Sequence, residues 1–192
     1  MTSPRTHSLG SAVTSGLLML TLLATSARAK DLAGATLPDT LSVGGKALAL
    51  NGLGLRKKAV FKVYVGALYL ASPSHDAAAI LVSDEAKAIR MHFLRDLSKD
   101  QLVDAFREGF DANAKDKAAQ EAAFDKMLAL VPDVKQDSTM TIAYVPGKGT
   151  TLSVGDKDLG TFEGKGFAQA VFAIWLGATP PSADLKSGML GS

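Results

Sequence analysis

The sequence predicts an α+β fold in which helices cover one face of an antiparallel sheet. Segments that alternate apolar and polar residues, as strands do, lie at both ends of the region beyond residue 29. Segments with the helical spacing of apolar residues gather between those strands and after them, instead of alternating with them one by one. No internal repeat or linker interrupts the pattern. We therefore expect one domain over residues 30–192.

The first 29 residues have the pattern of a secretory signal peptide. A weakly basic segment with Arg5 precedes the apolar run 16–24 and the small-residue pattern Ala27-Arg28-Ala29. The alternative is a transmembrane anchor, but the run is about half the roughly 20 residues that such a helix needs. The chain also lacks the cysteine of a lipoprotein anchor. We expect the remaining chain to be periplasmic or secreted, with no stable membrane anchor.

The first strands are expected after a loose surface segment, residues 30–40. The next residues alternate around a Gly44-Gly45 turn and predict a β-hairpin. The stretch GLGLR is interpreted as a glycine-punctuated turn that ends at Arg56. A long strand follows from about residue 60, and its successive residues point to opposite faces. One parity is wholly apolar, and the other is mixed and includes Tyr64.

The helices are predicted from caps and apolar stripes. Ser98 with Gln101 three positions later forms a capping box. The helix that it opens carries Leu102, Phe106 and Phe110 along one stripe. The same criteria predict a short helix at 76–82 and helices at 115–130 and 164–176. Alternation of apolar and polar residues predicts a strand at 88–94 and a meander of strands over 138–164.

Composition excludes several classes of function. Of 21 basic and 19 acidic residues, two of the basic ones fall within residues 1–29, so the remaining chain has no net charge. A nucleic-acid surface would need a net basic face. The chain has no cysteine, and His75 and His92 lack the spacing of a metal motif, so we expect no metal. We also expect no cofactor, no nucleic-acid partner and a monomer.

The stretch GLGLR followed by FKVYVGALYL resembles the signature segment of the chalcone isomerase-like proteins. The closing stretch GKGFAQAVFAIWLGATPPSADLK is similar to the last helix of that family, and FLRDLSKDQLVDAFREGF stands where the family has its long central helix. The resemblance covers most of residues 40–190. It implies the family's fold, a curved antiparallel sheet with a layer of helices on one face and a ligand cleft between sheet and helices.

The resemblance places the family's arginine on Arg56. In the plant enzymes this arginine holds the phenolate of the substrate, and in fatty-acid-binding members it holds a carboxylate. Both tasks suit a planar, permanently charged donor. The strand position that is threonine in the plant isomerases and tyrosine in fatty-acid-binding members falls on Tyr64, if the hairpin after Arg56 is shorter here. Arg56 and Tyr64 are therefore the expected ligand-binding residues.

The catalytic positions of the plant enzymes are not retained. The resemblance places their helix tyrosine on Leu102, their asparagine on Gly109 and their closing-helix threonine on Ile174. No catalytic residue is therefore assigned, and we expect these three residues to line an apolar pocket together with Phe106. A pocket with apolar walls and one polar clamp suits an amphiphilic carboxylate.

Three functions remain open. The favoured hypothesis is non-catalytic binding of a fatty acid, a similar apolar carboxylate or a phenolic ligand. The alternative is an isomerase, an intramolecular lyase acting on a substrate other than chalcone, with Arg56 as oxyanion holder. A third is an accessory protein in envelope lipid handling that works through its surface.

Each site residue also has a purely structural interpretation. Arg56 stands among other basic residues and could be solvated, and Tyr64 could be half-buried with its hydroxyl in water. Arg90 and Arg95 flank one strand and are candidates for a second anion contact that we do not assign. Trp175 is interpreted as a core residue.

Overall fold

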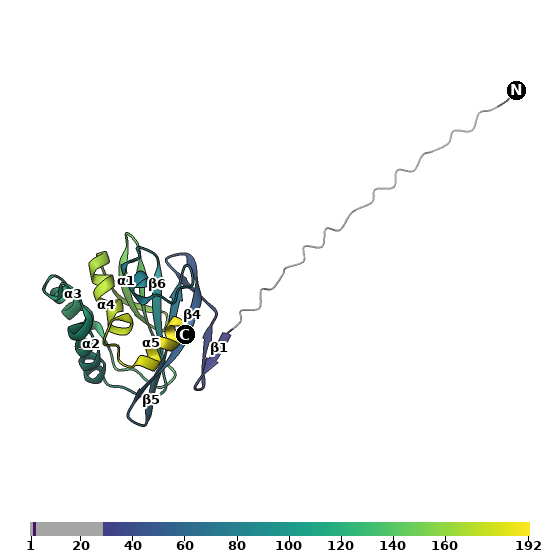
Figure 1. Cartoon of the computed structure of the whole chain (residues 1–192). Coiled ribbons are helices and arrows are strands. Elements are labelled where there is room, and N and C mark those ends of the chain that lie inside the picture. Colours follow the sequence, from purple (N-terminus) through teal and green to yellow (C-terminus); the bar gives the residue numbers. More distant parts are fainter. Residues whose placement is uncertain (1, 3–28) are drawn as a thin grey trace.

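The computed structural model of the chain describes residue 2 and residues 29–192 (Figure 1). The signal peptide predicted over residues 1–29 lies outside the described residues except at its two positions 2 and 29. No helix in the described part of the chain is long and apolar enough to cross a membrane.

One antiparallel sheet dominates the fold. Seven strands in the described residues form it, and each strand pairs with its neighbours in the sequence. They are β3 (Thr40–Val43), β4 (Lys46–Lys58), β5 (Phe61–Leu70), β6 (Lys87–Phe93), β7 (Thr139–Val145), β8 (Gly149–Val154) and β9 (Lys157–Phe162). The sheet curls, and this brings β3 and the β3–β4 turn against β7, although β5 and β6 lie between the turn and β7 in the strand order. A Cβ atom added to Gly44 in that turn would lie 2.8 Å from Val145 Cγ2.

The helices give the fold its second layer. The described chain has α1 (Ala77–Val82), α2 (Lys99–Asn113), α3 (Lys117–Leu130), α4 (Lys165–Leu176) and α5 (Ala183–Leu190). Figure 1 shows α2, α3 and α4 on one side of the sheet and β1 on the other. Helix α4 packs against α1, α2 and α3, and nine of its 12 residues are buried. This layering confirms the predicted α+β class with helices on one face of a curved antiparallel sheet.

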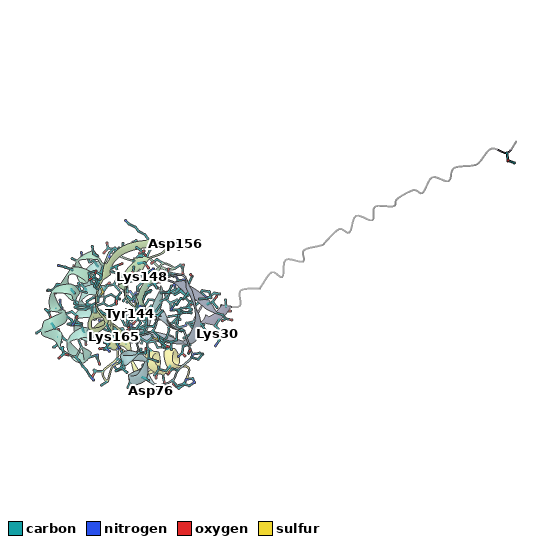
Figure 2. The ribbon with its side chains drawn as sticks, turned by 90° about the horizontal axis from the view of Figure 1, so that it is seen from above. Lys30, Asp76, Tyr144, Lys148, Asp156 and Lys165 are labelled. Atoms are coloured by element: carbon teal, nitrogen blue, oxygen red, sulfur yellow. The ribbon has the colours of Figure 1, made fainter. Side chains whose placement is uncertain are left out.

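Strand β5 is buried on both faces. Tyr64 and Leu68 belong to the main core between sheet and helices, with side chains of α2 and α4. Val65 and Tyr69 belong to a second core on the opposite face, together with Leu37. Figure 2, which looks down on the same molecule, shows Tyr144 of β7 near the middle of the domain and Lys30 of β1 at its periphery.

The expected strands and helices beyond residue 60 are confirmed close to their expected ends. The capping box is also present. Ser98 Oγ accepts from the backbone N–H of Gln101 at 3.3 Å, and Gln101 Oε1 accepts from the backbone N–H of Ser98 at 3.0 Å.

The prediction of a loose surface segment at residues 30–40 is wrong. Strands β1 (Ala29–Leu32) and β2 (Ala35–Pro38) form a two-stranded hairpin over the outer face of the sheet. Ala35 and Leu37, at alternate positions of β2, are 0% and 2% exposed, so their side chains anchor the segment on the sheet. The Tyr69 hydroxyl donates to the Pro38 carbonyl at 2.9 Å and ties the hairpin to β5.

The interpretation of GLGLR as a turn is also wrong, because these residues lie inside β4. Helix α5 was not predicted from the sequence either, and its position explains why the turn was predicted wrongly. The α5 backbone packs directly on β4. A Cβ atom on Gly54 would lie 2.1 Å from the Leu185 carbonyl oxygen, and one on Gly188 would lie 2.3 Å from the Leu53 carbonyl oxygen. The glycines are therefore required for a close helix–strand contact and not for a turn.

Candidate ligand-binding site

Arg56 and Tyr64 face each other across two neighbouring strands. They are direct partners in the β4–β5 register, and Tyr64 also pairs with Phe93 on β6. The register shifts immediately after Arg56, where a β-bulge separates this pair from the next, Lys57 with Lys62. Bulges re-aim side chains and recur beside functional sites. The pairing puts Arg56 and Tyr64 on the helix-facing side of the sheet.

Tyr64 is held as a hydrogen-bond donor. Its side chain is 8% exposed, and its hydroxyl accepts from Trp175 Nε1 on α4 at 3.0 Å. Among the described residues, no hydrogen bond takes up the hydroxyl's own proton. Burial raises the pKa of Tyr64 to about 12, against the opposing effects of the Trp175 hydrogen bond and the Arg56 charge. The phenol is thus protonated at neutral pH, with its proton available to a ligand.

A cavity of about 460 Å³ opens at this pair. Its size lies within the range of roughly 300–1,000 Å³ that is typical of small-molecule sites. Its walls come from β4 and β5, the segment after β6, helix α2, helix α4 and the segment after α4. The apolar part of the lining consists of Phe61, Val63, Leu97, Leu102, Ala105, Phe106, Gly109, Ala112, Ile174, Trp175, Pro180 and Pro181.

All six residues predicted for the site line this one cavity. Arg56 comes from β4, Tyr64 from β5 and Ile174 from α4, and the stripe on α2 supplies Leu102, Phe106 and Gly109. Their contact with a ligand stays a prediction. The interpretation of Tyr64 as half-buried with a wet hydroxyl does not fit the structure, because the ring is buried and the hydroxyl is bonded to Trp175.

Arg95 and Trp175 also line the cavity, although the sequence did not lead to their assignment to it. Arg95 lies at the rim with its guanidinium carbon 4.9 Å from the Phe61 ring centroid. Trp175 is a core residue, 1% exposed, and lines the cavity as well. The position of Arg95 follows from parity, since it is two residues beyond Phe93, the β6 partner of Tyr64. Arg90 does not line the cavity, and its Nε donates to Thr141 Oγ1 at 3.0 Å.

Charged groups of both signs surround the mouth. Lys58 and Arg95 are exposed there, and Arg56 is half-buried with a hydrogen bond to the Lys57 carbonyl. Asp104 and Glu108 are exposed on the α2 side. The basic groups lie on the sheet side, so an anion that enters there meets Arg56 and Tyr64 together. Within residues 29–192, no three His, Asp or Glu side chains are grouped so that they could hold a metal ion.

Comparison with known proteins identifies the family. A family model described as chalcone isomerase-like matches residues 29–191. The chain belongs to the chalcone isomerase-like family. A search of curated proteins finds no significant match.

Among solved structures of this fold, the chain is similar to a fatty-acid binding protein of Arabidopsis thaliana. The TM-score is 0.71 at 16% sequence identity, and the match covers 85% of this chain and 96% of that chain. At this identity the likeness confirms the chalcone isomerase-like fold and no more.

Within this family fold, the departures at positions 109 and 174 are structurally linked. A Cβ atom on Gly109 would lie 2.5 Å from Ile174 Cγ2, so the absence of a side chain on α2 makes room for the isoleucine on α4. An asparagine at 109 would not fit beside Ile174. Together with Leu102, the pair gives the inner cavity wall no hydrogen-bonding side chain where the resemblance places the polar groups of the plant enzymes.

Proposed function

We propose that the protein binds a fatty acid or a similar apolar carboxylate in the cavity, without changing it chemically. Arg56 and Tyr64 hold the head group, and the site operates in the periplasm after removal of the signal peptide. One observation carries the proposal. A buried phenol, kept protonated by its burial and oriented by an indole N–H, stands opposite an arginine in a cavity whose other inner walls are apolar.

The head-group site suits an anion. A carboxylate has two oxygens, and it accepts one hydrogen bond from the Arg56 guanidinium and one from the Tyr64 hydroxyl. Because Trp175 Nε1 already donates to that hydroxyl, the remaining phenolic proton points away from the indole. A neutral amide or ester would gain less, since hydrogen bonds to charged groups are about twice as strong as neutral ones.

The walls suit a hydrocarbon chain. Phe106 on α2 and Trp175 on α4 make an edge-to-face contact with ring centroids 5.6 Å apart, and both line the cavity. Burying one methylene group of a ligand against such a surface contributes about 0.8 kcal/mol. Affinity should therefore rise with chain length, while the head-group pair both adds to affinity and sets the orientation of the ligand.

Binding without turnover is supported by the shortage of acid–base groups. Tyr64, with a pKa of about 12, does not act as a base at neutral pH. Asp104 and Glu108 are the carboxylates in the described lining, and both are exposed on α2. The positions that resemble catalytic ones in the plant enzymes carry Leu102, Gly109 and Ile174.

The test uses residues 30–192 and the emission of Trp175, the only tryptophan in the sequence. Titration of palmitate into the protein should change this emission, because the indole lines the cavity. Arg56→Gln should weaken binding about 10- to 100-fold, since a charge-assisted hydrogen bond contributes roughly 1.5–3 kcal/mol. Tyr64→Phe should weaken it about 10-fold. Lys57→Gln, which removes the neighbouring exposed charge outside the cavity, is the matched control and should bind as the wild type does.

Native mass spectrometry of the protein purified from the periplasm complements the titration. A fatty acid carried by the wild type and lost from Arg56→Gln supports the proposal. Equal affinities of Arg56→Gln and Lys57→Gln would overturn it. Turnover of a hydroxylated enone that disappears in Arg56→Gln would establish the isomerase alternative instead.

A further inference from the structure

The turn between β4 and β5 exposes apolar side chains. Val60 is 86% exposed and Phe61 57% exposed. The turn has two residues, and Ala59 adopts a φ of 53°, in the left-handed region that disfavours side chains. Two-residue hairpin turns favour Asn-Gly, which would be both more polar and less strained. Figure 1 shows the hairpin extending beyond the adjacent strands at the bottom of the view.

Basic residues surround this apolar turn. We name residues 57–62 the hairpin tip. It contains Lys57, Lys58 and Lys62, all exposed, and no acidic residue. The exposed Arg95 lies over the Phe61 ring and adds a fourth positive charge.

The acidic residues near the tip do not neutralise it. Asp96 next to Arg95 is paired with Lys135, with Nζ and Oδ2 2.9 Å apart. Asp104 and Glu108 lie across the cavity mouth on α2. The tip therefore combines exposed apolar residues with a locally basic surface, although the region beyond residue 29 has no net charge.

The hairpin tip also forms part of the cavity wall. Lys58 and Phe61 line the cavity together with Arg95 and Arg56. A ligand that leaves the cavity through this mouth passes directly over the tip. The β3–β4 and β7–β8 turns lie at the opposite end of the sheet, away from the cavity mouth and the hairpin tip.

We propose that the hairpin tip docks the protein on an anionic lipid bilayer. Val60 and Phe61 enter the interface between head groups and acyl chains, and the lysines and Arg95 bind lipid phosphates. This arrangement is typical of peripheral membrane binding, where buried apolar area and attraction to anionic lipids act together. Docking places the cavity mouth against the bilayer, so an apolar carboxylate passes between lipid and cavity without crossing water. The transfer step rests on the proposed function, whereas docking itself does not.

The experiment is flotation of the full mature chain with vesicles. Vesicles of phosphatidylglycerol and phosphatidylethanolamine should carry the protein, and vesicles of phosphatidylcholine should not. Lys57→Gln combined with Lys62→Gln should weaken binding about 10-fold or more, because each basic residue near an anionic surface contributes about five-fold. Val60→Ser should weaken it on the order of 10-fold through lost apolar burial. These three residues are outside the cavity lining.

Matched controls separate the tip from general effects. Val82→Ser removes another exposed valine, 60% exposed, at the end of α1. Lys46→Gln with Lys148→Gln removes two exposed lysines at the opposite end of the sheet, of which Lys148 is labelled in Figure 2. Both controls should float as the wild type does. Flotation that is absent in the wild type, or lost equally in tip and control variants, would overturn docking.

A second readout distinguishes failure of docking from failure of the proposed function. Palmitate titration in solution should be the same for the Lys57→Gln/Lys62→Gln variant as for the wild type. A wild-type protein that floats but binds no palmitate would support docking and contradict the proposed function. A wild-type protein that binds palmitate but does not float would support the proposed function and contradict docking.

Discussion

The strand pair β4–β5 is closed by a helix at one end and open to a cavity at the other. At the closed end, Gly54 pairs with Gly66, Leu185 of α5 packs on both, and Met189 packs on Gly66. Two residues further along the same face, Arg56 pairs with Tyr64, and the space above them is the cavity. The absence of side chains lets a helix backbone reach the sheet at one end, whereas long polar side chains hold space open at the other. Stability and ligand binding are therefore separable along one pair of strands.

The largest effect on stability is expected from adding a side chain at Gly54, where α5 packs on β4. Gly54→Val places a side chain where a Cβ atom would already lie 2.1 Å from the Leu185 carbonyl oxygen. Strand propensity favours valine by at most about 1 kcal/mol. Displacement of α5 costs far more, and we expect the free energy of unfolding, measured with urea, to fall by more than about 4 kcal/mol.

Gly66→Ala is the graded control for this change. Its Cβ atom would lie 3.0 Å from Leu185 Cδ1 and 3.2 Å from Met189 Sδ, which are the ends of flexible side chains. We expect a loss of about 1–2 kcal/mol. An equal loss in both variants would contradict the assignment of the closed end to a backbone contact.

A smaller effect is expected where α2 meets α4 beside the cavity. Gly109→Ala gains about 1 kcal/mol of helix propensity. Overpacking against Ile174, with the Cβ atom 2.5 Å from Cγ2, costs about 1–3 kcal/mol. We therefore expect a net loss of about 1 kcal/mol in the free energy of unfolding.

A double-mutant cycle with Ile174→Ala isolates this contact. Removing Cγ2 makes room for the alanine at 109, so the two changes should couple favourably by at least about 0.5–1 kcal/mol. Additive effects of the two substitutions would show that the helices adjust to a side chain at 109 by another route.

The long elements were predictable from the sequence because their patterns repeat many times. The stripe on α2 and the alternation in β5 each extend over at least ten residues. Strands β1 and β2 have four residues each, too few for a periodic signal. The role of GLGLR was misinterpreted because glycine favours both turns and close backbone contacts. Only the position of α5 decides between them.

For the site, the residue types were predictable and their arrangement was not. Arg56 and Tyr64, which the resemblance assigns to one site, line one cavity, but the β-bulge that makes them direct partners leaves no mark in the sequence. The hydrogen bond from Trp175 to Tyr64 joins residues 111 positions apart. It depends on how α4 packs over β5, which is a property of the whole core.

The smallest effect is expected from pH, because palmitate affinity should not change as the solution becomes alkaline. A tyrosine with the usual pKa near 10 begins to lose its proton by pH 9, and a phenolate would repel a bound carboxylate. Burial raises the pKa of Tyr64 to about 12. Because the raised pKa preserves the neutral form, palmitate affinity should stay constant between pH 7 and pH 10 in a Trp175 titration.

Tyr64→Phe sharpens this pH prediction. The variant cannot ionise at position 64, so the ratio of its affinity to that of the wild type should be the same at every pH in this window. A ratio that approaches one between pH 9 and pH 10 would mean that Tyr64 has already lost its proton, and that its hydroxyl is solvated. In that case the open end of the β4–β5 pair would hold a ligand through Arg56 alone. The indole contact would then serve packing, as the glycines do at the closed end.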